Sequence, residues 1–159
     1  MQNRGPVHSE ARRSSRSLPR VKRTSGPFMD LVRADVPLRE KIDTIRRGVP
    51  AGQIDSMVEY LDVSKSDVFQ VLAMPGSTGH ALIKNKRRLD RGSSERVVRV
   101  AEIARAAERT FGNHEAAARW LKSENRALGG VTPLSMLDTS PGAVEVRRIL
   151  SAIDFGGAF

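Results

Sequence analysis

The chain has 159 residues, a formal net charge of +9 and 39% hydrophobic residues, which suffices for one or two small domains. It contains no cysteine, which excludes disulfides and thiol chemistry and fits the reducing cytoplasm in which we expect the protein to reside. No apolar run approaches the ~20 residues of a membrane span, and the basic N-terminus lacks the apolar core of a secretory signal.

Residues 1–27 carry seven Arg or Lys against the single acid Glu10, and they have hardly any large apolar side chains. Such a segment buries too little surface to offset its chain entropy, so we expect a disordered basic tail. One interpretation is an arm that contacts DNA phosphates. The other is a solvated extension, or a reading frame whose start is placed too early.

Helical periodicity begins at Phe28. One or two helices are expected before Gly48, with Leu38, Ile42 and Ile45 on one face. A helix is predicted over 51–61, and Ser64 with Asp67 forms a capping-box pattern for the next. After a break at Met74-Pro75-Gly76, a third helix is predicted to run from Ser77 toward Leu89.

Helix, short turn and helix are typical of a helix-turn-helix, whose second helix, here about 77–85, enters the major groove. Residues 77–99 have a net charge of +5, whereas residues 28–76 have −2. The candidates for base contact are Ser77, Thr78 and His80, and those for phosphate contact are Lys84, Lys86, Arg87, Arg88 and Arg91. The alternative interpretation is a solvated basic face of a helical bundle.

A further helix is predicted over 95–111, with Ser94 as its cap. Its apolar stripe suits either an intramolecular core or a homodimer interface, and its arginines are expected on the outer face. The stripe consists of Val97, Val100, Ala104, Ala107 and Phe111, and the arginines are Arg96, Arg99, Arg105 and Arg109.

The last third, 111–159, has a balanced charge and well-marked helix ends. Asn113 is a predicted helix cap, Gly129-Gly130 a turn with positive φ, and Thr132-Pro133 and Ser140-Pro141 are helix starts. A lone tryptophan on a helical stripe, Trp120, is expected to point inward.

The run WL…ENRALGGVTPLSML…GAVEVRRILSAIDFG resembles the toxin-binding domain shared by the Xre, MbcA and ParS antitoxins. The resemblance covers about 82–159 well and extends loosely back to about Arg39. It rests on an ordered set: Trp120-Leu121, the Leu128-Gly129-Gly130 turn, Thr132-Pro133 and the closing helix. This resemblance implies an all-α protein with an Xre-like helix-turn-helix domain over 28–110 and a toxin-binding domain over 111–159.

The resemblance also implies a function: an antitoxin of a type II toxin–antitoxin system that is a homodimer. It would neutralise a RES-type, NAD-degrading toxin by covering the active site and would bind the promoter of its own operon. We expect toxin contacts from Asp154, Phe155, Gly156 and Phe159. The residues expected to shape the domain are Trp120, Leu128, Gly129, Gly130, Thr132 and Pro133.

Catalysis has little support. The three histidines, His8, His80 and His114, have no second ligand at metal-binding spacing, and neither a phosphate-binding Gly-Lys-Ser/Thr loop nor a GxSxG motif occurs. We therefore expect no enzyme, metal or cofactor. One alternative is a helix-turn-helix repressor whose C-terminal domain dimerises or senses another partner. Another is a toxin binder without operator binding, because Gly79 and Ala81-Leu82 stand where related antitoxins often have Leu and Arg-Arg.

Overall fold

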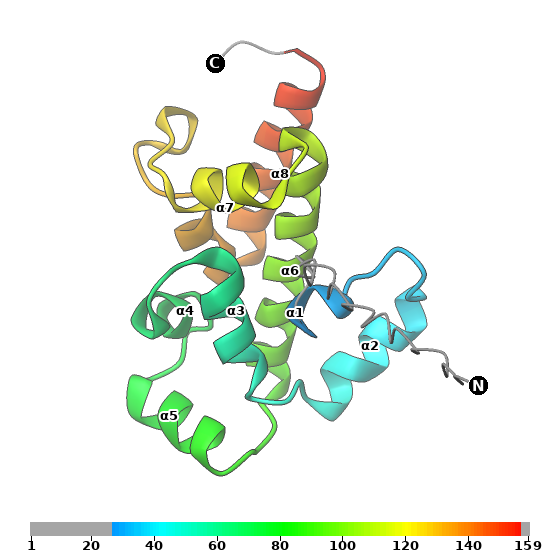
Figure 1. The fold of residues 1–159 in the computed structure, drawn as a ribbon, viewed down its shortest axis with the longest axis vertical. Coiled ribbons are helices and arrows are strands. Elements are labelled where there is room, and N and C mark those ends of the chain that lie inside the picture. Colours follow the sequence, from blue (N-terminus) through cyan, green and yellow to red (C-terminus); the bar gives the residue numbers. More distant parts are fainter. Residues whose placement is uncertain (1–26, 157–159) are drawn as a thin grey trace, which may run out of the picture.

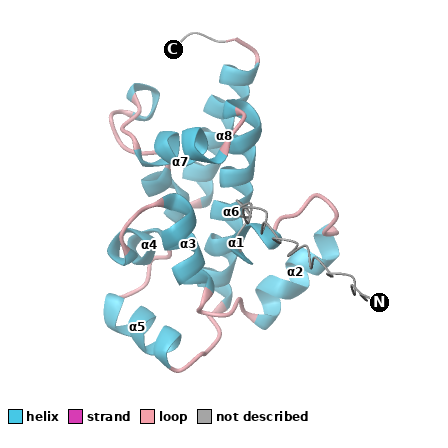
Figure 2. Ribbon diagram, in the orientation of Figure 1, coloured by secondary structure: helices cyan, strands magenta, loops and turns pink. Residues whose placement is uncertain are grey.

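The computed structural model describes residues 27–156, and this part of the chain is all-helical, which confirms the predicted fold class (Figures 1 and 2). The helices are α1 (Pro27–Asp30), α2 (Leu38–Arg47), α3 (Gln53–Leu61), α4 (Lys65–Val71), α5 (Gly76–Lys84), α6 (Arg91–Phe111), α7 (His114–Lys122) and α8 (Ser140–Asp154), with two 3-10 turns, η1 (Arg126–Leu128) and η2 (Leu134–Asp138). The predicted tail lies outside the described residues, apart from Pro27, which begins α1.

Helix α6 is the spine of the molecule: α1, α2, α7, α8 and η2 all pack against it (Figure 1). The predicted stripe faces inward, and Val97, Val100, Ala104 and Ala107 are all 0% exposed. One apolar core runs from Phe28 in α1 to Leu150 in α8 and so draws on both predicted domains. The stripe is therefore intramolecular core, and it is not available as the homodimer interface that the sequence left as an alternative.

The start of α6 differs from the prediction. The helix begins at Arg91, and its cap is Asp90, whose carboxylate accepts a 2.9 Å hydrogen bond from the Ser93 backbone N–H. Ser94 is fully buried inside the helix, where its Oγ accepts a 2.9 Å bond from the backbone N–H of Val49. Both residue types are good caps. The prediction was wrong because Ser94 bonds to Val49, which lies 45 positions earlier in the chain, and so does not cap the helix.

Helix α5 ends at Lys84, which agrees with the reading helix predicted over about 77–85 but falls short of Leu89, toward which the helical pattern extended. Lys86 has a positive φ of 50°, which turns the chain out of the helix. The following segment then runs beside residues 49–51, where Leu89 N–H donates to the Val49 carbonyl (2.8 Å) and Ala51 N–H to the Arg87 carbonyl (2.9 Å). This pairing fixes the far end of α5 to the body of the protein.

Arg99 is not on the outer face, as the sequence pattern suggested. Its side chain is buried and ion-pairs with Glu95. It donates to the Leu137 carbonyl (3.0 Å) and to the Ser140 hydroxyl (2.9 Å). These bonds join α6 to η2 and α8, and they occupy Ser140, so the cap of α8 is Thr139, whose hydroxyl accepts from Gly142 N–H.

Candidate functional site

Helix α5 is the surface on which the DNA-contact residues were predicted, and it projects at the lower end of the molecule in Figure 1. The turn from α4 to α5 has the helix-turn-helix order, and Ala73 takes the left-handed φ of 51° within it. Ser77 and Thr78 are exposed in the first turn of α5, and His80 and Lys84 are exposed further along it. These four side chains are available to a ligand, as expected for a reading helix.

Gly79, by contrast, faces the protein. A Cβ atom added at this position would lie 2.2 Å from Cε1 of Phe69 in α4, so the two helices meet at a contact that no side chain fits. The same phenylalanine holds the His80 ring edge-on, with ring centroids 5.0 Å apart. Glycine here sets how closely α5 approaches α4, a role that the sequence pattern did not reveal.

The predicted phosphate contacts have different surroundings. Lys86, Arg87 and Arg91 are exposed. Arg88 is already engaged, because its Nη1 donates a 2.7 Å hydrogen bond to the Gly48 carbonyl. It holds the segment after α5 against residues 49–51, so part of its hydrogen-bonding capacity is structural.

Asp90 follows this basic segment and caps the N-terminus of α6. Hydrogen bonds from the backbone N–H and the hydroxyl of Ser93 hold the pKa of Asp90 below its usual range. The carboxylate also lies at the N-terminus of α6, where a negative charge is favourable. The cap therefore stabilises the start of α6 through its charged form.

The predicted toxin-contact residues lie at the C-terminal end of α8, which Figure 1 shows in red at the opposite end of the molecule from α5. Phe155 is 91% exposed, and its neighbours Asp154 and Gly156 are exposed as well. Gly156 has a φ of 74°, a conformation that other residues rarely adopt. Phe159 lies outside the described residues. The structure therefore brings Asp154, Phe155 and Gly156 together on a projecting end.

The predicted shaping residues stand beside this end. Trp120 is half-buried, and its ring packs against Phe111 with centroids 5.4 Å apart. Gly129 and Gly130 both have positive φ, and Asn125 closes the turn through hydrogen bonds with Gly130 and Val131. The Thr132 hydroxyl accepts from Ser135 N–H at 3.2 Å, and Pro133 is buried beside it. The remaining member of the set, Leu128, is half-buried against the core.

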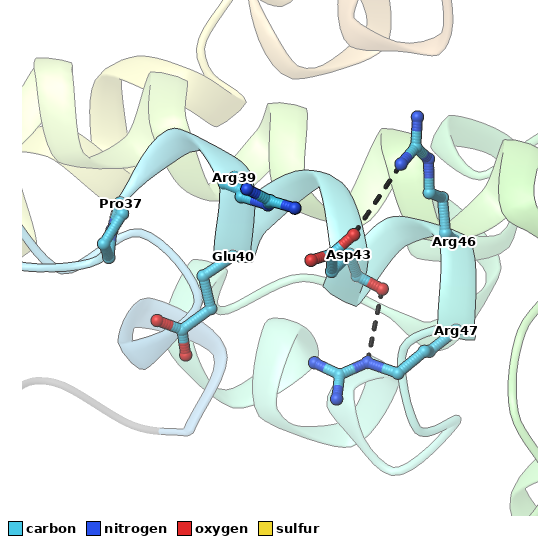
Figure 3. A pocket seen from close by; sticks show the side chains of 6 residues that line it. All are labelled: Pro37, Arg39, Glu40, Asp43, Arg46 and Arg47. Carbon is cyan, nitrogen blue, oxygen red and sulfur yellow. Dashed lines mark hydrogen bonds and ion pairs between the residues drawn. The ribbon is translucent and has the colours of Figure 1, made fainter.

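Helix α2 offers two further surfaces. On its outer side lies a hollow of about 490 Å³ lined by Pro37, Arg39, Glu40, Asp43, Arg46 and Arg47 (Figure 3). Its charges are mixed: Arg46 lies 3.7 Å from the Asp43 carboxylate, and Arg47 donates to the Asp43 carbonyl. On the side toward α8, Leu38 is 72% exposed and Val144 63% exposed at the edge of an apolar groove.

Two further observations concern metal binding and membrane-spanning helices. No group of three or more His, Asp or Glu side chains among residues 27–156 is arranged to hold a metal ion. Within the same part of the chain, no helix is both long and apolar enough to span a membrane.

Comparison with known proteins identifies a family. Residues 106–156 match the sequence model of the antitoxin Xre/MbcA/ParS C-terminal toxin-binding domain. The chain is 28% identical over 113 residues to antitoxin Xre of Photorhabdus laumondii, covering 70% of this chain and 76% of that protein. It is 29% identical over 126 residues to the Prs ADP-ribosylating antitoxin of a Sphingobium species, covering 74% and 79%. Antitoxin Xre of Pseudomonas putida is 34% identical over 83 residues, 52% of each chain.

Proposed function

We propose that this chain, an antitoxin of the Xre/MbcA/ParS type, neutralises a RES-type, NAD-degrading toxin by covering the toxin's active site. It acts without catalysis of its own, as a binding protein in the cytoplasm. We propose further that it represses its own operon by binding the promoter through α5.

The observation that carries the toxin assignment is the match of residues 106–156 to a toxin-binding domain that ends in an exposed aromatic side chain. Phe155 is 91% exposed just past the end of α8. Leaving this much apolar surface in water is unfavourable, and a partner that covered the ring would remove that cost. Exposed aromatic residues are frequent anchors of protein interfaces. Asp154 and Gly156 flank it, and together these residues form the proposed plug for the toxin's active site.

Operator binding is supported by the surface of α5. Ser77 and Thr78 are exposed at its N-terminus, where a reading helix contacts base edges, and Lys84 is exposed at its other end. The basic residues Lys86, Arg87 and Arg91 follow on the same stretch and supply phosphate contacts. The missing Arg-Arg pair at Ala81-Leu82 limits base readout rather than affinity, because phosphate contacts supply most of the affinity.

A homodimer is proposed because an operator read by a helix-turn-helix protein is commonly two-fold symmetric. The surface that supports it is the apolar groove between α2, α6 and α8. There, Leu38, Ile42 and Val144 are 72%, 37% and 63% exposed. The charged residues of the rim are paired within the protein, as in Lys41–Glu102 (3.6 Å) and Arg147–Glu102 (2.9 Å), so the surface favours an apolar partner.

A second candidate function is a repressor whose C-terminal domain only dimerises. The same exposed residues of α5 favour it, because they require no toxin. The two functions differ in one testable respect: an antitoxin protects cells from a toxic partner, whereas a repressor does not.

The deciding experiment is co-expression with the protein encoded next to this chain's gene, followed by co-purification and an assay of cellular NAD. The antitoxin function requires that the neighbour alone depletes NAD and that a stable complex with this chain restores it. Deleting residues 155–159, which removes Phe155, is expected to free the toxin while leaving binding to promoter DNA intact. Full NAD protection by the truncated chain would contradict the covering mechanism.

A further inference from the structure

A basic groove lies between the loop after α1, the start of α2, the C-terminal half of α6 and the last two turns of α8. Its volume is about 450 Å³. Five cationic side chains line it: Arg33, Lys41, Arg105, Arg109 and Arg147. We call these residues and the space between them the arginine groove. They come from four separate segments of the chain, so no local run of positive charge indicates it.

The positive charge of the arginine groove is only partly neutralised within the protein, where Arg33 is ion-paired with Asp35 (2.7 Å). Its lining includes two carboxylates, Glu102 and Asp154, against five cations. Glu102 is shared, because Arg147 lies 2.9 Å and Lys41 3.6 Å from it. In the described part of the chain, neither Arg105 nor Arg109 has a carboxylate within 4.0 Å. Like charges that line one groove repel one another, and an anionic occupant relieves that repulsion.

The shape of the arginine groove restricts its occupant. Val32 and Leu150, which are 3% and 2% exposed, line it together with Ala106, so apolar atoms lie beside the charged groups. A space of this size admits the side chains of a peptide segment. Guanidinium groups recognise carboxylates through paired hydrogen bonds, and the alkyl parts of an acidic side chain suit the apolar lining.

The position of the arginine groove indicates which partner supplies those carboxylates. Arg109 and Arg147 belong to the toxin-binding region 106–156, and Asp154 both lines the groove and precedes the exposed Phe155. The groove thus continues directly into the proposed plug, whereas α5 lies at the other end of the molecule (Figure 1). A partner that receives Phe155 therefore lies next to Asp154 and within reach of the arginine groove.

We propose that the arginine groove receives an acidic segment of the toxin, whose carboxylates pair with Arg105 and Arg109. This inference rests on the proposed function, because it adds a second contact to the same complex. The plug covers the active site, and the groove supplies electrostatic affinity and orientation. Charge pairs at the edge of an interface act mainly on association rate and salt dependence.

The test is the affinity of the full chain for the co-purified neighbouring protein, measured at 50 and 300 mM salt. The variants are Arg109→Glu, which changes an exposed side chain, and Arg105→Gln, which removes a half-buried charge. Arg119→Glu is the matched control, because Arg119 is an exposed arginine in the toxin-binding region that does not line the groove. We expect at least tenfold weaker binding for Arg109→Glu at low salt, a smaller loss at high salt, and a change below twofold for the control.

The outcomes separate the two proposals. If the unaltered chain forms no complex, the toxin assignment fails, and the groove assignment fails with it. If the unaltered chain binds, and both groove variants bind the neighbouring protein as tightly as the unaltered chain does, only the groove assignment is wrong. Loss of promoter binding with unchanged toxin affinity would assign the arginine groove to DNA instead. A toxin variant in which one acidic residue is replaced by a basic one, and which restores the affinity of Arg109→Glu, would identify the residue that pairs with Arg109.

Discussion

The backbone of Gly79 lies directly against the ring of Phe69, and no side chain fits between them. We expect Gly79→Ala to displace α5 and weaken promoter binding, although alanine favours a helix by roughly 0.5–1 kcal/mol over glycine. Gel shifts together with thermal unfolding measure the effect. Gly52→Ala is the control, because nothing lies within 4 Å of an added Cβ there and its φ of −60° suits alanine. Unchanged promoter binding by Gly79→Ala would show that the position of α5 does not matter.

Lys84→Ala is expected to weaken promoter binding about equally for all sequences and to lower the salt slope by about one. The reason is that an exposed lysine at the end of α5 contacts phosphate rather than base edges. Titrations at several salt concentrations measure the slope. Arg126→Ala, an exposed cation in η1, is the control and should leave the slope unchanged.

Phe155→Ala is expected to abolish protection against the toxin while leaving the unfolding temperature unchanged, because the side chain is 91% exposed. NAD levels in co-expressing cells and calorimetry of the purified protein give the two readouts. Ile149→Ala, in the buried face of the same helix, is the contrasting variant and should destabilise the fold by roughly 2–5 kcal/mol. A Phe155→Ala variant that protects as well as the unaltered chain would exclude the plug.

Ile42→Glu is expected to convert a dimer into a monomer without unfolding it, since Ile42 is 37% exposed beside Leu38 and Val144. Light scattering after size-exclusion chromatography measures the mass. Val131→Glu is the control, because Val131 is similarly exposed, at 42%, but lies in the turn after η1. A dimer that persists in Ile42→Glu would place the interface on another surface.

Asp90 predicts an acid-dependent loss of stability. Its pKa is lowered in the folded state, so its contribution is fully present above about pH 4 and is lost as the pH falls through the lowered value. Asp90→Asn keeps a capping side chain but has no charge to lose. Urea unfolding at pH 6 and pH 3 should show a smaller acid-induced loss for Asp90→Asn than for the unaltered chain. Equal losses would mean that other carboxylates dominate.

Local sequence signals predicted most of the elements because their causes are local. The capping box of Ser64 and Asp67 and the positive φ of Gly129 depend on residues a few positions apart, and the structure confirms both. Asp90 and Ser94 are equally good caps by type. Only the bond between Ser94 and Val49, distant in sequence, decides between them.

The features that the sequence did not reveal are made by distant segments. Arg99 looked like an outer residue of a helix because its acceptors, the Leu137 carbonyl and Ser140, lie about 40 positions away. The arginine groove was missed for the same reason, as was the contact between Gly79 and Phe69. The predicted toxin contacts Asp154, Phe155 and Gly156 form one continuous run at the end of a helix, so the sequence alone was enough to place them on one surface.

The 21-residue helix α6 carries the supports of both proposed binding surfaces within one apolar core. A proteolytic cut within α6 would therefore leave two fragments. Each would expose the apolar surface that the other had covered. Neither fragment would keep a complete core. Because one apolar core supports both proposed surfaces, degradation that begins at either end of the molecule would remove the proposed toxin contact and the proposed operator contact together.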